Sequence, residues 1–500
     1  MFRTKLPVKK EHIIMKNVRH ILSRHILSAV LSGLLMLSCT GCGQTERGAA
    51  QDTPVVIEVW HYYNGEQQSM FDTLLEEFNK TVGEEKGIVV KGSAQGSVAD
   101  LERKILASIN GEVGAGDIPN IFAAYSSTAY TADLQGLVVD LSGFMSEDER
   151  AAYVDGYIAE GDFAGNGEMK LFPVAKSTEV LVLNETDWNS FAQETGASKE
   201  SLATMEGLVD TAKRYYEWSD GKTPEIANDG KAFFGRDSMA NYILIGGMQL
   251  GTEIFSVEDG KLELKFDVDT IRRIWDYYYI PYIKGYFAAS AHFRSDDLKT
   301  GTIVSYVGSS AGAPYIPKEV VASDTESYPI TVDVLPAPQF ENGEPYAVQQ
   351  GAGMVVTTAP EEEVQACVEF LKWFTDKEQN IKFSLQSGYL PVKKEANTHE
   401  AVFRTEPEVS ELVENSLAVA IDTVNNNYMH TVNAFDTGIE ARETLECILR
   451  DRAITDRETV LNRLSSGISL DEAVEEFCSD TYFQSWYESA KAELERFESD

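Results

Sequence analysis

Short apolar runs alternate with amphipathic segments along the first third of the chain. The runs at 55–60, 88–90 and 120–125 have the length and composition of buried strands. Between them, apolar residues recur every three or four positions, which predicts helices over 67–82 and 98–109. Strands that alternate with helices over short connections are typical of an α/β domain with a largely parallel sheet. We therefore expect one such domain in this part of the chain.

A second set of apolar runs begins after residue 173 and predicts a second α/β unit. Strands are expected at 178–183, 302–307 and 332–335, and the run at 351–356 is expected to return to the first sheet. Helical spacing predicts further helices over 205–218, 271–283, 361–374 and 376–386, and the C-terminal third is mostly helical in pattern. Ligands of parallel sheets bind beyond the carboxyl ends of the strands, so the residues that follow these runs are candidates for a site.

The N-terminal part has the pattern of a secretory signal. A basic segment from Met15 leads to an apolar stretch over 26–38 and then to small residues before Cys42. The apolar stretch is too short to span the ~30 Å of a membrane's hydrocarbon core. We expect a signal peptide over 1–41, with Met15 as an alternative start.

A cysteine that directly follows Gly41 resembles the lipobox of bacterial lipoproteins. Cys42 is therefore the expected lipidation site, and Cys39 is the second choice. Residues 42–53 are small and polar without apolar periodicity, which favours a flexible tether. No later segment approaches 18 consecutive apolar residues, so we expect the rest of the chain to be soluble and to meet the membrane through the lipid only.

Charge excludes one class of partner. The chain has 43 Lys and Arg residues against 80 Asp and Glu residues, a formal net charge of −37. Such a surface repels nucleic acid and anionic lipid, so no nucleic-acid partner is expected.

The remaining cysteines, Cys367, Cys447 and Cys478, are widely spaced and suggest neither a metal site nor a disulfide framework. Phosphate-binding, zinc-protease and calcium-loop motifs are absent from the sequence, and no cofactor or metal is expected.

One motif mimics an enzyme. Residues 308–312 fit the G-x-S-x-G pattern of a serine hydrolase and follow an apolar run, as a nucleophile elbow does. A catalytic triad would need a later histidine, for which His399 and His430 are available, while Pro314 and Pro317 crowd the helix that must follow. A surface serine hydrolase stays as the remote alternative, and we expect no enzyme.

Five segments together resemble the family 1 extracellular solute-binding proteins, which include maltodextrin- and glycerol-3-phosphate-binding proteins. They lie at 59–61, 106–121, 173–181, 306–310 and 370–392. The resemblance implies an α/β, type II periplasmic-binding-protein-like fold with two α/β lobes, a hinge and a ligand cleft between the lobes. Carried onto this chain, lobe 1 is 54–173 plus 350–395 and lobe 2 is 174–349 plus 396–500, with crossovers near 172–176 and 348–351.

The resemblance also implies a function. The chain is expected to be the substrate-binding lipoprotein of an ABC importer, a monomer on the outer face of a bacterial cell membrane that delivers a mono- or oligosaccharide to a permease. The alternative ligand is glycerol-3-phosphate or another polyol phosphate. The family holds that phosphate with an arginine after the C-terminal linker, and the stretch at 417–427 has no Arg or Lys. A dianion without a fork-shaped donor is poorly held, which favours a neutral sugar.

Sugars need flat aromatic faces and directional hydrogen-bonding groups. The resemblance implies ligand contacts at Tyr62 or Tyr63, Ser177, Ser309 or Ser310, Gly351 and Tyr389. Residues at or near the predicted strand ends and crossovers add Trp60, Gln95, Tyr125, Ser126, Lys176 and Glu179. Tyr63 and Tyr125 are expected to form one wall of the cleft, and Ser309, Ser310 and Lys176 the other.

Overall fold

The computed structural model describes residues 53–403 and 410–498, apart from residue 259. The expected signal peptide, Cys42 and nearly all of the expected tether lie outside the described residues. Within the described ranges, no helix combines the length and the apolar character needed to cross a membrane.

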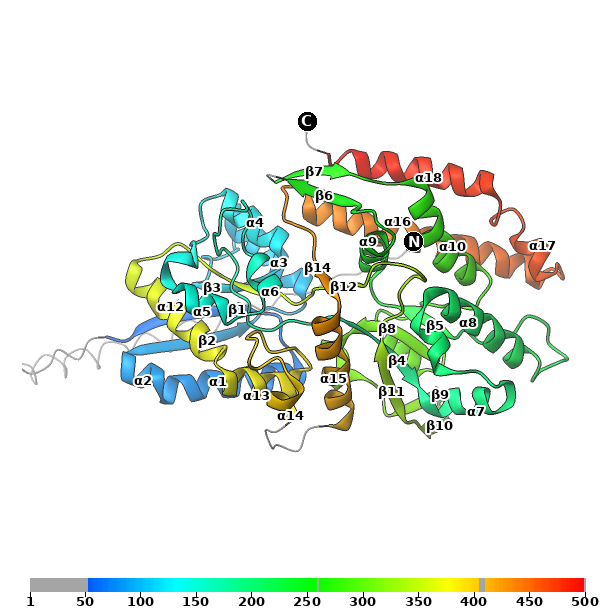
Figure 1. The fold of residues 1–500 in the computed structure, drawn as a ribbon, viewed down its shortest axis with the longest axis horizontal. Helices are drawn as coiled ribbons and strands as arrows, with labels where there is room; N and C mark the ends of the chain where they lie inside the picture. Colours follow the sequence, from blue (N-terminus) through cyan, green and yellow to red (C-terminus); the bar gives the residue numbers. More distant parts are fainter. Residues whose placement is uncertain (1–52, 259, 404–409, 499–500) are drawn as a thin grey trace, which may run out of the picture. The chain divides into compact units, whose positions relative to one another are not determined.

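The first sheet has four strands in the order β13-β3-β1-β2 (Figure 1). The strands β1 (Val55–His61), β2 (Ile88–Ala94) and β3 (Ile121–Ala124) are parallel. The fourth strand, β13 (Gly353–Val356), returns from far along the chain and pairs antiparallel with β3. All residues of β3 and β13 are buried, which explains their continuous apolar sequence. The predicted parallel sheet and its returning strand are confirmed.

Helices cover this sheet where the spacing predicted them. The helix α1 (Gly65–Lys80) packs against β2, and α12 (Glu361–Phe374) packs against β1. The helix α3 (Val98–Ile109) begins with a capping box between Ser97 and Asp100. The other helical elements that follow or precede these strands are α2 (Val82–Lys86), α4 (Ser126–Leu134), a 3₁₀ turn at Leu141–Phe144, α5 (Glu147–Ala151), α6 (Asp155–Ala159), α13 (Lys377–Ser387) and α14 (His399–Phe403).

The second sheet has the order β11-β4-β8-β5. Its strand β4 (Glu179–Asn184) pairs antiparallel with both β11 (Val332–Pro336) and β8 (Ser305–Ser309). The short strand β5 (Phe234–Arg236) pairs parallel with β8. The strand predicted at 302–307 is therefore real but begins at Ser305, after a turn.

The remaining elements surround the second sheet or extend from it. The helices are α7 (Glu185–Thr195), α8 (Met205–Asp220), α9 (Met239–Gln249), α10 (Val268–Ile283), α11 (Arg294–Lys299), α15 (Glu411–Asn426), α16 (Gly438–Ser465), α17 (Leu470–Val474) and α18 (Asp480–Glu495), with 3₁₀ turns at Lys199–Ala203 and Ser310–Tyr315. The small strand pairs are β6 (Phe255–Glu258) with β7 (Lys261–Leu264), β9 (Glu319–Ser323) with β10 (Glu326–Pro329), and β12 (Tyr346–Val348) with β14 (Tyr428–His430).

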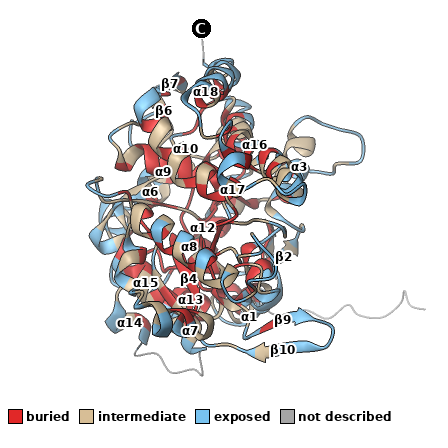
Figure 2. Cartoon of the chain, turned by 90° about the vertical axis from the view of Figure 1, so that its right-hand side faces the viewer, coloured by how far each residue is buried: buried red, intermediate tan, exposed pale blue. Residues whose placement is uncertain are grey.

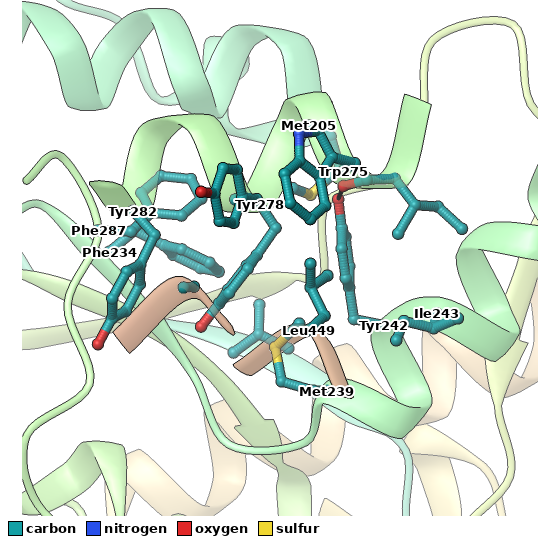
Figure 3. Close-up of a cluster of buried hydrophobic side chains, with 14 of the residues drawn as sticks. Met205, Phe234, Met239, Tyr242, Ile243, Trp275, Tyr278, Tyr282, Phe287 and Leu449 are labelled. Carbon is teal, nitrogen blue, oxygen red and sulfur yellow. Dashed lines mark hydrogen bonds between the residues drawn. The ribbon is translucent and has the colours of Figure 1, made fainter. Parts of the chain in front are cut away.

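Two hydrophobic cores each lie mainly around one sheet, and a third packs one face of the second sheet against α13, α14 and α15. Around the second sheet, aromatic rings from several elements pack together, with ring centroids 5.6 Å apart for Tyr242 and Tyr278 and 4.8 Å apart for Phe234 and Phe287 (Figure 3). The strand β4 is buried throughout, whereas the β9–β10 hairpin is mostly exposed (Figure 2). The two sheets are thus joined by packing, because α13 contacts both α1 and the third core, as well as by the connecting segments.

The segments that connect the two sheets run side by side. Phe172 bridges Met354, and Ser177 bridges Gln350, each by a pair of backbone hydrogen bonds of 2.8 to 3.0 Å. Lys176 bridges Leu390 in the same way. These segments include the positions at which the sequence predicts crossovers, and the exact lobe boundaries stay a prediction.

Candidate functional site

A cavity of about 550 Å³ lies between helices that come from both sheets. The helices α3 and α4 follow strands of the first sheet, while α9 and α16 pack on each other beside the second. Its polar lining consists of Glu102, Tyr125, Ser126, Ser127, Asn241, Gln349, Gln350, His430, Thr431, Arg442, Glu443 and Glu446. Its apolar lining includes Val98, Leu244, Ile245, Phe255, Val348, Val432, Phe435 and Ile439.

Two of the predicted ligand contacts line this cavity. Tyr125 directly follows β3 and is the N-terminal capping residue of α4, with 38% of its surface exposed. Ser126 is the first residue of α4 and is buried. Their position follows from the parallel sheet, because the carboxyl end of β3 opens towards the cavity.

Two carboxylates from different helices, Glu102 and Glu443, line the cavity. Glu102, on α3, accepts a hydrogen bond of 3.0 Å from the Thr128 hydroxyl. Burial raises the pKa of Glu102, and the like charge of Glu443 on α16 raises it further, while the Thr128 bond and Arg442 lower it. Burial also lowers the pKa of His430, which favours the neutral form of this side chain, although the charge of Glu253 opposes the shift.

Arg442 was not found by the sequence analysis. It lies on α16, and its Nη2 donates a hydrogen bond of 2.6 Å to Oδ1 of Asn241. The stretch at 417–427, which has no basic residue, forms most of α15 and the residue after it, whereas Arg442 comes from the next helix. The expected linker stretch thus supplies no basic residue, and the guanidinium in the cavity lining comes from the helix that follows it. Helical spacing could place Arg442 on a helix, but it carries no signal for the partner that the helix faces.

The remaining carboxylate of the cavity has a structural role. Both oxygens of Glu446 accept hydrogen bonds at the start of α9, from the backbone N–H of Met239 and Ala240 and from the Ser238 hydroxyl, over 2.8 to 3.1 Å. A negative charge at a helix N-terminus is stabilised by the helix dipole. Glu446 therefore couples α16 to α9 and is not free to bind a ligand with these oxygens.

Close backbone approach brings α16 onto α4. A Cβ added to Gly438, the first residue of α16, would lie 2.7 Å from Oγ of Ser127. Such a contact is shorter than van der Waals distance, so a larger residue at 438 would require the Ser127 hydroxyl to move. The two helices therefore meet at one rim of the cavity.

Lys176 lies at the crossovers and is almost fully buried, with 1% of its surface exposed. Its Nζ forms an ion pair with Glu160 and donates a hydrogen bond of 2.7 Å to the carbonyl oxygen of Gly351. Glu160 also accepts a hydrogen bond of 2.7 Å from Nε2 of Gln349, which lines the cavity. Lys176 thus contacts the cavity lining through Glu160 and does not line it.

The other predicted polar contacts lie near the start of β4. The Ser309 hydroxyl donates to Oγ of Ser177 over 3.1 Å. Glu179 forms a buried ion pair with Arg236 and accepts a bond of 2.9 Å from Nδ2 of Asn241. Gly351 has a φ of +93°, and a Cβ there would lie 2.5 Å from the Ala175 carbonyl oxygen, so only glycine fits.

The other predicted aromatic contacts are largely buried. The hydroxyls of Tyr62 and Tyr389 lie 3.3 Å apart. Tyr63 has 2% of its surface exposed and packs against the rings of His61, Phe71 and Phe383. Nε1 of Trp60 donates to Glu58 over 2.9 Å, and Gln95 bonds Ser93 and Lys104. These side chains do not line the cavity, and their ligand roles stay predictions.

The serine motif does not form a triad. Oγ of Ser310 is buried and has no hydrogen-bond partner among the described residues. The Ser309 hydroxyl donates to Ser177, so neither hydroxyl bonds a histidine. His399 pairs with Asp422 at 2.8 Å instead. Across the part of the chain that the structure describes, no group of three or more His, Cys, Asp or Glu side chains is placed to hold a metal ion.

Comparison with solved structures shows the fold. The cyclic α-maltosyl-1,6-maltose binding protein from Arthrobacter globiformis has a TM-score of 0.62 and 18% identity, over 89% of this chain and 100% of that one. The GacH receptor of Streptomyces glaucescens, known in complex with acarbose, has a TM-score of 0.61 and 14% identity, over 89% of this chain and 100% of that one. UgpB from Mycobacterium tuberculosis, in complex with glycerophosphocholine, has a TM-score of 0.61 and 18% identity, over 88% of this chain and 98% of that one. The expected type II periplasmic-binding-protein-like fold is confirmed.

Comparison of the sequence alone gives the family. A search of curated proteins found no match. The model of the family described as bacterial extracellular solute-binding protein matches residues 73–411. This range is more than half of the chain and includes β2, β3, β13 and the whole second sheet. The chain therefore belongs to the bacterial extracellular solute-binding proteins.

Proposed function

We propose that this protein captures a mono- or oligosaccharide outside a bacterial cell membrane and delivers it, chemically unchanged, to the permease of an ABC importer. The observation that carries the proposal is the cavity of about 550 Å³ between helices of both sheets. Cavities that bind small molecules measure about 300–1,000 Å³ and combine apolar walls with a few polar groups. This cavity has both properties.

The lining suits a sugar. Tyr125, Phe255 and Phe435 offer aromatic surface for the C–H faces of a sugar ring. Ser126, Ser127 and Thr431 offer hydroxyls that both donate and accept hydrogen bonds. Two of the similar solved structures are named for binding a cyclic maltose derivative and for a complex with acarbose, which supports the same ligand class here.

Binding is proposed to close the protein about a hinge. Lobe 1 is 54–173 plus 350–395, and lobe 2 is 174–349 plus 396–500. The paired crossover segments supply the hinge, and the ligand contacts helices of both lobes. A ligand that touches both walls favours the closed state by its greater affinity for that state. The closed monomer is the form that the permease recognises.

The same proposal places the protein on the outer face of the membrane. A signal peptide over 1–41 directs export, and lipid on Cys42 anchors the chain through the tether at 42–53. Membership of an extracellular family supports the location outside the cytoplasm.

A thermal-shift screen tests the proposal. A ligand that binds only the folded state raises the melting temperature by mass action. We expect at least one member of a panel of mono- and oligosaccharides to raise it, and titration calorimetry to give a one-to-one complex. If no sugar binds while glycerol-3-phosphate does, carbohydrate capture is wrong.

Arg442 supports a second candidate, a polyol phosphate. A guanidinium in the cavity is the donor that the sequence analysis had missed. Glu102 and Glu443 line the same cavity and oppose an anion, which makes this candidate weaker. If glycerol-3-phosphate binds, R442Q should weaken its binding far more than that of any neutral sugar, as calorimetry would show.

A further inference from the structure

The cavity has acceptors that the protein leaves without donors. Oε1 of Gln350 is buried and has no hydrogen-bond partner among the described residues. Glu102 has one described partner, the Thr128 hydroxyl on Oε1. Glu443 forms no hydrogen bond or ion pair with another residue that the structure describes. All three side chains line the cavity.

The strongest donors of the lining, in contrast, are already engaged. The Arg442 Nη2 bonds Asn241, and Nδ2 of Asn241 bonds Glu179 over 2.9 Å. Nε2 of Gln349 bonds both Glu160 and the Gly156 carbonyl oxygen. Because a buried acceptor without a donor costs free energy, Oε1 of Gln350 favours a ligand that supplies a donor, while the exposed Glu443 adds negative charge to the lining.

Glu102 and Glu443 line the cavity from different helices. Glu102 comes from α3, which follows a strand of the first sheet, and Glu443 comes from α16, which packs on α9 and α10. The like charge of Glu443 raises the pKa of Glu102, so the two carboxylates repel each other. Arg442 offsets only part of this charge, and Glu446 is held at the N-terminus of α9.

An ammonium group on the ligand would supply both the donors and the positive charge that this lining lacks. It carries three donors, no acceptor and a positive charge. Hydrogen bonds between charged partners are about twice as strong as those between neutral groups. Tyr125 adds an aromatic ring within the same lining, and such rings attract cations through their faces.

We propose that the ligand is a carbohydrate that carries a protonated amino group, and that Glu102 and Glu443 bind this group from two helices. The inference rests on the proposed function and narrows it to one class of sugar. Because the ammonium lies between these carboxylates, it removes a repulsion that otherwise opposes closure.

Matched pairs of sugars test the inference. Glucosamine is compared with glucose, galactosamine with galactose, and the β-1,4-linked glucosamine disaccharide with cellobiose. Each pair differs only by amino groups in place of hydroxyls at carbon 2. Calorimetry is done at about pH 6, where amines of this kind are protonated. In at least one pair we expect the amino sugar to bind about tenfold more tightly, which corresponds to one charged hydrogen bond.

Conservative variants assign the preference to the two carboxylates. E102Q and E443Q keep the size of each side chain and remove its charge. Each substitution should bring the ratio of the two affinities, amino sugar to neutral sugar, close to one. E440Q is the matched control, because Glu440 is exposed on the same helix and does not line the cavity. It should keep the ratio of the native protein. Binding of the neutral sugar by E102Q and E443Q verifies that both variants fold.

The outcomes separate the inference from the proposed function. If the neutral sugars bind at least as tightly in every pair, or if the preference survives both substitutions, the amino-sugar inference is overturned and carbohydrate capture stands. If neither member of any pair binds while glycerol-3-phosphate does, the amino-sugar inference and the proposed carbohydrate capture are both wrong.

Discussion

The ammonium of Lys176 donates a hydrogen bond of 2.7 Å to the carbonyl oxygen of Gly351 and so joins the two crossover segments through a side chain. Glu160 pairs with the same ammonium, and both charges are almost fully withdrawn from water. Gly351 also has a backbone conformation that only glycine adopts readily, which allows its close approach to the Ala175 carbonyl oxygen. The segments proposed as the hinge are therefore linked by a buried ion pair and by the hydrogen bond of Lys176 to Gly351.

K176M should destabilise the protein by about 3–5 kcal/mol, because it leaves Glu160 as a buried charge without its partner. Urea unfolding followed by circular dichroism measures the change. The double variant K176M/E160Q should lose less than the sum of the two single variants, since it leaves no unpaired charge. Additive losses would mean that the two residues do not stabilise each other.

Y125A should weaken sugar binding by about 1–3 kcal/mol, the scale of a lost aromatic contact. Titration calorimetry with the best sugar from the screen measures it. Y315A is the control, because Tyr315 is also partly exposed but lies outside the cavity. Y63A should instead lower the free energy of unfolding by about 3–5 kcal/mol, because Tyr63 is a core residue. Equal loss of affinity in Y125A and Y315A would argue against this cavity.

G438A should weaken ligand binding by about 1–3 kcal/mol, because its new methyl group collides with Ser127 and holds α16 away from α4. Small-angle scattering should show a larger radius of gyration in the presence of ligand than for the native protein. Removal of the Ser127 hydroxyl in S127A/G438A should restore part of the affinity. Native affinity in G438A would show that the two helices do not need to meet.

Acid should destabilise the fold through His61. This imidazole has 1% of its surface exposed, and burial lowers its pKa from 6.5 to about 4. The unfolded chain therefore binds a proton between these values when the folded chain does not, so stability falls as the pH drops from about 6.5 to about 4. The loss is about 3 kcal/mol. H61F keeps an aromatic ring, and the difference between its unfolding free energy and that of the native protein should change by this amount across the window. If the difference between the two unfolding free energies does not change with pH, His61 is not the group whose protonation destabilises the fold.

C42A should release the protein from bacterial membranes, because lipidation needs the thiol. Immunoblots of membrane and soluble fractions measure the distribution. C39A should remain in the membrane fraction. The reverse result would move the anchor to Cys39.

Regular elements could be predicted because their pattern is local. The helix over 98–109 has a complete apolar stripe and a capping pair, and the structure gives it the same bounds. The strand β5, of three residues, and the pair β12 and β14 are too short for any periodicity. The start of β8 is shifted because Thr302 and Ile303 belong to the apolar run but precede the residues that pair with β4 and β5.

The site was harder to predict, because it depends on which helices meet. Tyr62 and Tyr63 follow the same strand as neighbours, and the sequence does not say which side chain enters the core. Lys176 has the chemistry of a ligand donor, and only the fold reveals its partner, Glu160, on a five-residue helix. Arg442 and Glu443 lie on α16, whose distance from β3 in the chain hides that they share a cavity with Tyr125.

The position of β1 in its sheet has a mechanical consequence. The described chain enters the fold through this strand, which pairs along its whole length with β2 and at its end with β3. A pull on the N-terminus acts along the strand axis, while the interstrand hydrogen bonds of a parallel pair lie across that axis at even spacing. The load is therefore shared by many bonds in shear and does not peel them one at a time. A chain held at its N-terminus against flow or collision resists extraction of β1 at the point where the force arrives.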